Sequence, residues 1–145
     1  MIKRTVADLA PAELKGRRAL VRVDFNVPLD EGGSVSDDTR IRAAIPTLQV
    51  LIKGGARVVL CSHLGRPKGK PEPKYSLAPV ARRLQELLKK PVSFVPSVVG
   101  ADAETATRAL GDGEVLLLEN TRFEAGEVKN DAALAQAFAK LGDFY

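Results

Sequence analysis

Cysteine is nearly absent from the sequence, because Cys61 is the only one among 145 residues. A single thiol excludes an internal disulfide bond and any zinc site that needs several cysteines. Cys61 follows an apolar run at positions 58–60, so we interpret it as a small buried hydrophobic residue, with a reactive thiol as the alternative. This sparing use of cysteine is typical of proteins in a reducing compartment and predicts a cytoplasmic location.

Aromatic residues, blocks of like charge and long hydrophobic runs are also scarce. Aromatic side chains make up 5% of the sequence and tryptophan is absent, although the net charge is +4. The mixed basic and aromatic surface of single-strand nucleic-acid binders is therefore missing, and we expect no nucleic-acid partner. The basic loop at 68–74 leaves such binding as an alternative. No apolar stretch approaches the length of a membrane span, so we also expect no membrane partner.

Sequence motifs for nucleotides and metals are missing as well. The nearest approach to a phosphate-binding loop, GRPKGK at 65–70, has the wrong spacing and is followed by Pro71. There is no G-x-G-x-x-G fingerprint and no group of residues with metal-ligand spacing. The sequence therefore predicts neither a nucleotide site nor a metal site within this chain.

What the sequence does contain is a regular alternation of segment types. Apolar, β-rich runs predict strands at 19–27, 57–62, 92–95 and 114–118. Helical periodicity predicts helices at 39–53, 76–88 and 101–110, and a last helix that opens at 130–131. Strands separated by helices predict a parallel sheet, and the near-continuously apolar strands indicate that helices cover both faces. We therefore expect an α/β protein with a three-layer α/β/α, Rossmann-like sheet.

The ends of the predicted elements carry further information. Residues 36–38 suit the N-cap and first turn of the helix at 39–53, and Gly54 with Gly55 suits its end. Residues 142–145 have the pattern of a turn that enters another strand. We therefore expect residues 1–145 to form one domain that is incomplete at its C-terminal end.

Polar side chains follow the first predicted strand. Asp24 and Asn26 are two residues apart, so on a strand they would share one face, with Arg22 behind them. A carboxylate beside an amide can accept from and donate to a hydroxyl group. The alternative is a local role, in which Asp24 pairs with Arg22 and Asn26 holds the turn.

The second predicted strand leads into His63, the only histidine of the sequence. Beside it, Gly65 allows a ligand to approach the backbone, and Arg66 can form two parallel hydrogen bonds with a phosphate or carboxylate. The alternative is a solvated basic loop that also carries Lys68, Lys70 and Lys74.

Two further arginines complete the candidate site. Arg122 follows the fourth predicted strand and would reach the same cleft if that strand neighbours the first two; pairing with a nearby Glu119 or Glu124 is the alternative. Arg40 opens the helix at 39–53, where free backbone N–H groups also favour anions. Arg42 serves as its comparison and is expected to be an ordinary solvated arginine. Together, these residues predict a site that binds a small phosphorylated acid.

Four motifs, in this order and spacing, resemble the N-terminal domain of the phosphoglycerate kinase family. They are RVDFNVP at 22–28, SDDTRI at 36–41, SHLGRP at 62–67 and LLLENTRF at 116–123. The similarity runs across essentially the whole chain. Thr121 departs from the family pattern, which more often has an apolar residue there, and this change does not endanger a binding role.

The resemblance implies a glycolytic kinase with two domains. That family transfers a phosphoryl group between ATP and 3-phosphoglycerate, giving 1,3-bisphosphoglycerate and ADP, and it uses Mg²⁺. The resemblance implies that the N-terminal domain holds 3-phosphoglycerate or 1,3-bisphosphoglycerate, whereas Mg-ATP or Mg-ADP binds to a C-terminal domain that this chain lacks. We therefore expect the chain alone to be inactive and the full-length enzyme to be a monomer.

The family roles transfer to this sequence motif by motif. Asp24 and Asn26 would contact the substrate hydroxyl group. Arg40 would bind the substrate carboxylate and stabilise charge on the transferring phosphoryl group, which is the catalytic role.

The remaining matched residues would surround the 3-phosphate. His63, Arg66 and Arg122 would form a basic patch on this group, and the same substrate-binding motifs include Phe25, Leu64 and Gly65. No residue of this chain is expected to bind the nucleotide or the metal. The competing interpretation is a non-catalytic α/β module that binds anions or a protein partner.

Overall fold

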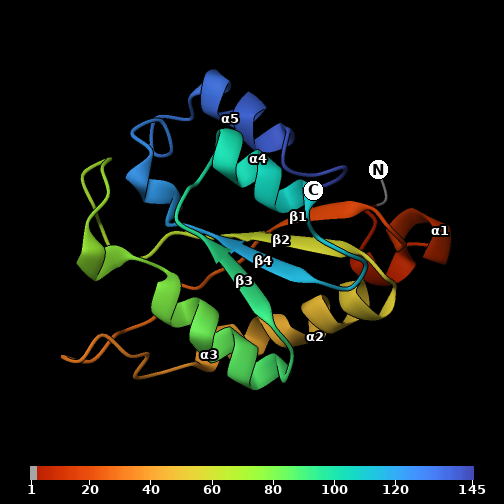
Figure 1. Ribbon diagram of the computed structural model, residues 1–145, viewed down its shortest axis with the longest axis horizontal. Coiled ribbons are helices and arrows are strands. Elements are labelled where there is room, and N and C mark those ends of the chain that lie inside the picture. The colour runs from red at the N-terminus through yellow and green to blue at the C-terminus, as the bar shows by residue number, and fades with distance from the viewer. Residues whose placement is uncertain (1–2) are drawn as a thin grey trace.

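A single parallel sheet forms the centre of the computed structural model, which describes residues 3–145. Its strands are β1 (Arg18–Arg22), β2 (Arg57–Cys61), β3 (Val92–Val95) and β4 (Val115–Leu118), in the spatial order β1-β2-β4-β3. The helices are α1 (Pro11–Leu14), α2 (Thr39–Lys53), α3 (Ala78–Leu88), α4 (Ala101–Arg108) and α5 (Ala132–Ala139), with short 3-10 helices η1 (Val6–Asp8), η2 (Pro73–Tyr75) and η3 (Thr121–Phe123). Figure 1 shows α2 and α3 on one face of the sheet and α4 and α5 on the other, which confirms the predicted three-layer fold.

The strand order explains which face each helix covers. From β1 to β2 and on to β3, the chain moves across the sheet in one direction, and from β3 to β4 it turns back. Because crossovers between parallel strands are right-handed, the helices of the outward moves and those of the return moves must lie on opposite faces. This rule assigns α2 and α3 to one face and α4 and α5 to the other (Figure 1).

Apolar side chains alternate between the two faces along β2. Val58 and Leu60 belong to one buried core, which they share with Leu84 of α3. Val59 belongs to the other core, together with Ala103 of α4. Full burial of a valine or leucine side chain stabilises a fold by about 1.5–3 kcal/mol, so the two cores hold the strand ends firmly in place.

Strand β1 is shorter than predicted and ends at Arg22 instead of continuing to position 27. Beyond Arg22, individual contacts tie the chain to the segment after β2: Val23 N donates to Cys61 O at 3.0 Å, and Phe25 N donates to Ser62 Oγ at 2.9 Å. Residues 24 and 26 therefore lie in a loop. The two-residue periodicity of a strand does not place them, and their positions follow from the contacts of the loop.

Helix α2 has the predicted bounds, but only part of the expected capping of its first turn is observed. The Asp37 carboxylate accepts from Thr39 N at 2.9 Å, which satisfies a free donor of the first turn. Asp38 occupies the N-cap position, yet its side chain makes no capping hydrogen bond, so the expected capping role is wrong for this residue. The helix ends at Gly54, and Gly55 follows with a φ of +80°, as the sequence predicts.

The outer edge of β1 is paired at one point. Ala19 forms a parallel bridge with Phe144, and Leu20 N donates to Phe144 O at 2.9 Å. This bridge confirms that residues 142–145 enter a further strand position beside β1. Helix α5 is only partly covered by the rest of the protein, because none of its residues is buried. Leu141, just beyond the end of the helix, is fully buried. No helix within residues 3–145 combines the length and apolar character required to cross a bilayer.

Candidate functional site at the carboxyl ends of the strands

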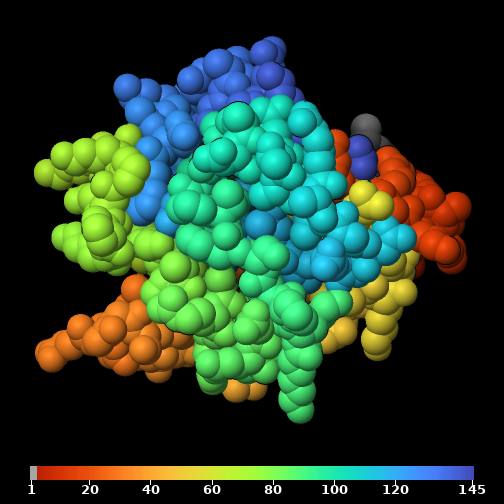
Figure 2. All heavy atoms as spheres, in the orientation of Figure 1, coloured from red at the N-terminus to blue at the C-terminus, as the bar shows by residue number. Residues whose placement is uncertain are grey.

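Three loops meet at one end of the sheet. They follow β1, β2 and β4 at 23–38, 62–77 and 119–131, and they lie together on the left of Figure 1. In Figure 2 the loop after β2, in yellow-green, and the hairpin after β1, in orange, project from this same side. The neighbours β2 and β4 lead to helices on opposite faces, so their ends mark a topological switch point of the sheet. Such a switch point is where open parallel sheets bind ligands.

Arg40 extends from the first turn of α2 over the loop after β1. Its Nη1 donates to Asn26 O at 2.7 Å and lies 3.4 Å from the Asp24 carboxylate. The alternative pairing of Asp24 with Arg22 is therefore wrong. About half of the Arg40 side chain remains exposed, at 53%, so its other N–H groups are free to meet a ligand.

Arg42 is occupied in a different way. Its Nε lies 2.9 Å from Asp38, one turn earlier in α2, and the same carboxylate also accepts two hydrogen bonds from Arg83 of α3. Hydrogen bonds from these two guanidinium groups lower the pKa of Asp38. Asp38 therefore fastens the start of α2 to α3 and indirectly fixes the backbone from which Arg40 extends.

Asn26 joins the first loop to the second. Its Oδ1 accepts from Gly65 N at 2.9 Å, which goes beyond the purely local role considered for it. Gly65 has a φ of +63°, a conformation that side chains disfavour, and an added Cβ would lie 2.5 Å from the ring of Tyr75. Glycine is therefore required here both by the backbone and by the close packing of Tyr75.

The second loop presents one histidine and one free arginine. The pKa of His63 is lowered from its ordinary value, first because partial burial disfavours the charged ring and then because Arg122 and Arg22 repel it. The neutral ring is thus the main form at pH 7. Arg66 is exposed, and within residues 3–145 no hydrogen bond or ion pair occupies its guanidinium group.

Asn120, after β4, is the polar centre of the cluster and received no role from the sequence. It is fully buried, its Oδ1 accepts from the backbone N of Leu64 and Arg122, and its Nδ2 donates to the carbonyls of Leu64 and Tyr75. One amide therefore fixes the loop after β2 against the loop after β4. An asparagine two residues after an all-apolar strand is the signal that could have indicated this role.

Glu119 supports the same junction from inside the fold. Its carboxylate accepts from Ser76 Oγ at 2.8 Å and from Leu77 N at 2.9 Å, at the start of α3. The alternative pairing of Arg122 with Glu119 or Glu124 is wrong.

Arg122 pairs with Glu127 instead, its Nε lying 3.3 Å from the carboxylate. Its Nη1 also donates to Gly65 O at 3.2 Å. The other oxygen of Glu127 accepts from Arg22 at 3.0 Å. No sequence pattern indicates this bridge, because 105 positions separate Glu127 from Arg22.

Phe25 and Leu64 belong to the site through their backbones. Both side chains are buried in the core, at 0% and 4% exposure. Phe25 N already donates to Ser62 Oγ, and both backbone groups of Leu64 bond to Asn120. These two residues thus hold the loops in place, and no side-chain group of either faces solvent.

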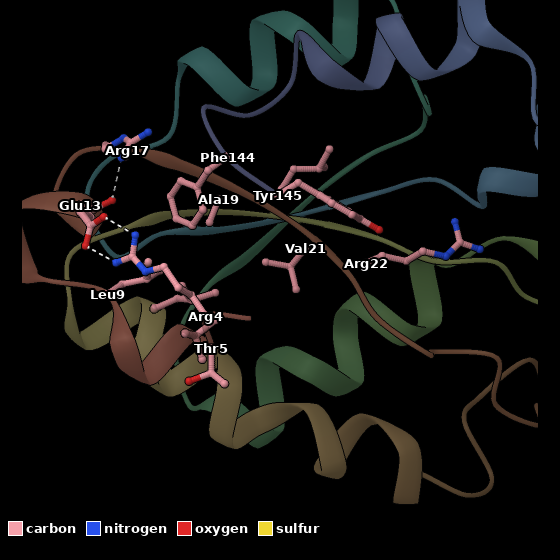
Figure 3. A pocket seen from close by; sticks show the side chains of 13 residues that line it. Arg4, Thr5, Leu9, Glu13, Arg17, Ala19, Val21, Arg22, Phe144 and Tyr145 are labelled. Atoms are coloured by element: carbon pink, nitrogen blue, oxygen red, sulfur yellow. Dashed lines mark hydrogen bonds and ion pairs between the residues drawn. The ribbon is translucent and has the colours of Figure 1, made fainter. Parts of the chain in front are cut away.

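A large hollow of the molecule lies away from the loop cluster that carries the candidate arginines. A hollow of about 480 Å³ runs along the outer edge of β1, and Figure 3 shows Arg4, Glu13, Arg17 and Phe144 around it. A smaller hollow of about 230 Å³ adjoins the loop cluster and is lined in part by Lys68, Arg122 and Lys129. Within residues 3–145, no group of three or more His, Cys, Asp or Glu side chains could hold a metal ion. The chemistry available at the loop cluster is therefore that of anion recognition by arginine.

Comparison with known proteins identifies relatives of the chain. The family model described as phosphoglycerate kinase matches residues 7–145. The phosphoglycerate kinase of Synechococcus elongatus is 57% identical over 145 residues, which cover 100% of this chain and 36% of that protein. The one from Herpetosiphon aurantiacus is 56% identical, with the same coverage.

Solved structures agree with the sequence relatives. Phosphoglycerate kinase from Coxiella burnetii superimposes with a TM-score of 0.78 at 41% identity, over 90% of this chain and 32% of that chain. The enzyme from Pyrococcus horikoshii gives a TM-score of 0.79 at 33% identity, over 90% and 33%. The chain spans about a third of the length of the relatives that it matches.

Proposed function

Because this chain belongs to the phosphoglycerate kinase family, we propose that its loop cluster is the 3-phosphoglycerate site of a kinase that exchanges a phosphoryl group with ATP. The observation that carries this proposal is the convergence of Arg40, Arg66 and Arg122 at one end of the sheet: Arg40 bonds to Asn26, Asn26 bonds to Gly65 beside Arg66, and Arg122 bonds to Gly65. Arginines suit the phosphate and carboxylate of such a ligand, and a carboxylate beside an amide suits its hydroxyl group.

The 3-phosphate of the ligand is assigned to the loops after β2 and β4. Within residues 3–145, the guanidinium group of Arg66 is unoccupied, and Arg122 uses only its Nε and Nη1. His63 lies beside them with a lowered pKa, and an incoming dianion would favour its protonated form. The phosphate would therefore gain charge-assisted hydrogen bonds and a proton-linked contact.

The reacting end of the ligand is assigned to the loop after β1 and the start of α2. Asp24 and Asn26 would hold the hydroxyl group, and Arg40 would bind the carboxylate whose oxygen exchanges the phosphoryl group. Phosphoryl transfer depends mainly on positioning and on positive charge near the transferring group. Arg40 supplies such a charge, and its contact with Asn26 O fixes the direction from which it acts.

The nucleotide belongs in this proposal to the part of the enzyme that the chain does not span. Residues 1–145 belong to the substrate domain, and the domain that binds Mg-ATP or Mg-ADP lies within the remaining two thirds of the relatives' length, with Mg²⁺ neutralising phosphate charge when bound. Closure of the two parts around the ligands would exclude water from the reaction. A monomeric enzyme in the cytoplasm completes the proposal.

A chimera tests this function directly. Residues 1–145 replace the matching 145 residues of the Synechococcus elongatus enzyme, whose 57% identity favours a compatible domain interface. We expect turnover that requires both 3-phosphoglycerate and ATP, measured as ADP release, with the unmodified enzyme as reference. A chimera that is folded by circular dichroism, yet neither turns over nor binds 3-phosphoglycerate, would favour a non-catalytic anion-binding module.

A further inference from the structure

Glu127 places a largely covered negative charge beside the proposed phosphate site. Its side chain is 11% exposed, less than the two arginines that it pairs with, Arg22 at 41% and Arg122 at 29%. Each carboxylate oxygen receives one guanidinium group, at 3.0 Å and 3.3 Å. Thr121 Oγ1 lies a further 3.5 Å from the oxygen that faces Arg22. This carboxylate is therefore the link between the end of β1 and the loop after β4.

The pairing determines how Arg122 is presented. A guanidinium group has five N–H donors in one plane. Glu127 takes the Nε donor, and Gly65 O takes one Nη1 donor. These two contacts restrict both the position and the rotation of the group. Within residues 3–145 no hydrogen bond occupies Nη2, so its two donors remain for a ligand.

Electrostatics alone would make this carboxylate unfavourable. A negative charge close to an anion site weakens anion binding through space. Glu124, on the same loop, also borders the hollow next to Arg122, and no hydrogen bond or ion pair occupies its carboxylate within residues 3–145. Both glutamates thus place a negative charge near Arg122, but only Glu127 forms ion pairs with arginines in the part of the chain that the structure describes.

We propose that Glu127 is a positioning residue that holds the Arg122 guanidinium group in the orientation required for the phosphate of the substrate, an inference that rests on the proposed function. Its orienting effect outweighs its repulsion of the ligand. Removal of Glu127 should therefore weaken substrate binding, although it makes the site more positive. Removal of Glu124 should leave binding unchanged or strengthen it.

Steady-state kinetics of the chimera separate these two effects. We expect Glu127→Ala to raise KM for 3-phosphoglycerate by about tenfold, because a displaced contact group commonly costs this much or more. The kcat and the KM for ATP should stay within about twofold, since Glu127 touches neither the reacting end nor the nucleotide. Glu124→Ala is the matched control and should not raise KM for 3-phosphoglycerate. Equal KM values in the two variants, or tighter binding in Glu127→Ala, would overturn the positioning role.

A double-mutant cycle guards against a purely structural explanation. If Glu127 acts through Arg122, then Glu127→Ala should raise KM less in an Arg122→Ala background than in the parent chimera. The same full increase in both backgrounds would contradict the proposal. Glu127→Gln, which keeps the size and one acceptor, should give an intermediate KM and provides the test if the alanine variant does not fold. An inactive parent chimera would overturn the proposed function and this inference together, whereas an active parent with indistinguishable glutamate variants would overturn the inference alone.

Discussion

The loop cluster at the carboxyl ends of the strands and the hollow along the edge of β1 differ in what their arginines do. In the edge hollow, the Arg4 guanidinium bonds to both oxygens of Glu13 at 3.0 and 2.8 Å, and Arg17 lies over the ring of Phe144 at 5.2 Å (Figure 3). In the loop cluster, Arg66 is exposed, and among residues 3–145 no hydrogen bond or ion pair occupies its guanidinium group. The edge hollow is the larger of the two, but Arg4 and Arg17 already make contacts within the protein there.

This difference shows why volume is a poor guide to function in this fold. A hollow beside a sheet edge follows from incomplete cover by neighbouring elements, and it implies no recognition of a ligand. Free N–H donors that converge from several elements are costly to arrange, because each charged side chain loses conformational freedom and repels the others. Their convergence is therefore the stronger sign of a binding site.

The largest expected effect separates two arginines of the same helix turn. In the chimera, Arg40→Ala should lower kcat by about a hundredfold or more, which is typical for loss of a group that stabilises transition-state charge. Arg42→Ala should lower it less than about threefold, because Arg42 pairs with Asp38 at the protein surface. Coupled assays of ADP release would measure both, and equal losses would contradict the assignment of Arg40.

Loss of the buried amide should affect stability next most strongly. Asn120→Ala removes four hydrogen bonds and leaves buried backbone groups without partners, so the free energy of unfolding should fall by about 3 kcal/mol. Glu13→Gln, at the edge hollow, should cost less because its ion pair with Arg4 is exposed. Urea denaturation followed by circular dichroism compares the two, and a larger loss at Glu13 would reverse the proposed contrast.

Glycine substitutions sharpen the role of the second loop. Gly65→Ala should cost about 2 kcal/mol from its left-handed backbone and the collision with Tyr75, and it should also raise KM for 3-phosphoglycerate. Gly33 has a similar φ of +82°, but a Cβ added at this position would meet no atom of residues 3–145 within 4 Å. Gly33→Ala should cost about 1 kcal/mol and leave KM unchanged. An equal rise of KM for 3-phosphoglycerate in both variants would show that the position of the loop after β2 does not control substrate binding.

The smallest effect is a shift in one titration. His63 is the only histidine of residues 1–145, and in an NMR titration of the chimera its ring signals are identified as those that disappear in His63→Gln. Its pKa in the free protein should lie below the ordinary value of 6.5, because burial and two arginines disfavour the charged ring. His63 therefore contributes full stability above pH 6.5 and loses it as the pH falls through the lowered pKa. Bound 3-phosphoglycerate should raise this pKa, and an unchanged value would remove His63 from the phosphate site.

The sequence predicted most elements of the fold because strong local patterns determine them. The near-continuous apolar runs of β2 and β4 and the helical stripe of α2 coincide with the observed elements to within one or two residues. The end of β1 was missed because a tertiary contact decides it, namely Ser62 Oγ accepting the backbone hydrogen bond from Phe25. Asp38 was expected to cap its helix, but Arg83 of α3, 45 positions away, takes its carboxylate.

Residues of the candidate site could likewise be predicted where local sequence patterns place them, and were missed where distant contacts do. Arg40, Arg66 and Arg122 were predicted because each stands at the end of an element, where the fold brings the loops together. Glu127 was missed because the role proposed for it depends on two partners, Arg22 at the end of β1 and Arg122 in the loop after β4, and no spacing along the chain reveals such a pair.

The most direct test of the central claim compares two arginine variants of the chimera by isothermal titration calorimetry with 3-phosphoglycerate. Arg66→Ala removes the unoccupied guanidinium group of the loop cluster, and Arg4→Ala removes a paired one from the edge hollow. Our account predicts a Kd at least about tenfold weaker for Arg66→Ala, which corresponds to about 1.4 kcal/mol, and an unchanged Kd for Arg4→Ala. Equal affinities in the two variants, or weaker binding in Arg4→Ala alone, would contradict it.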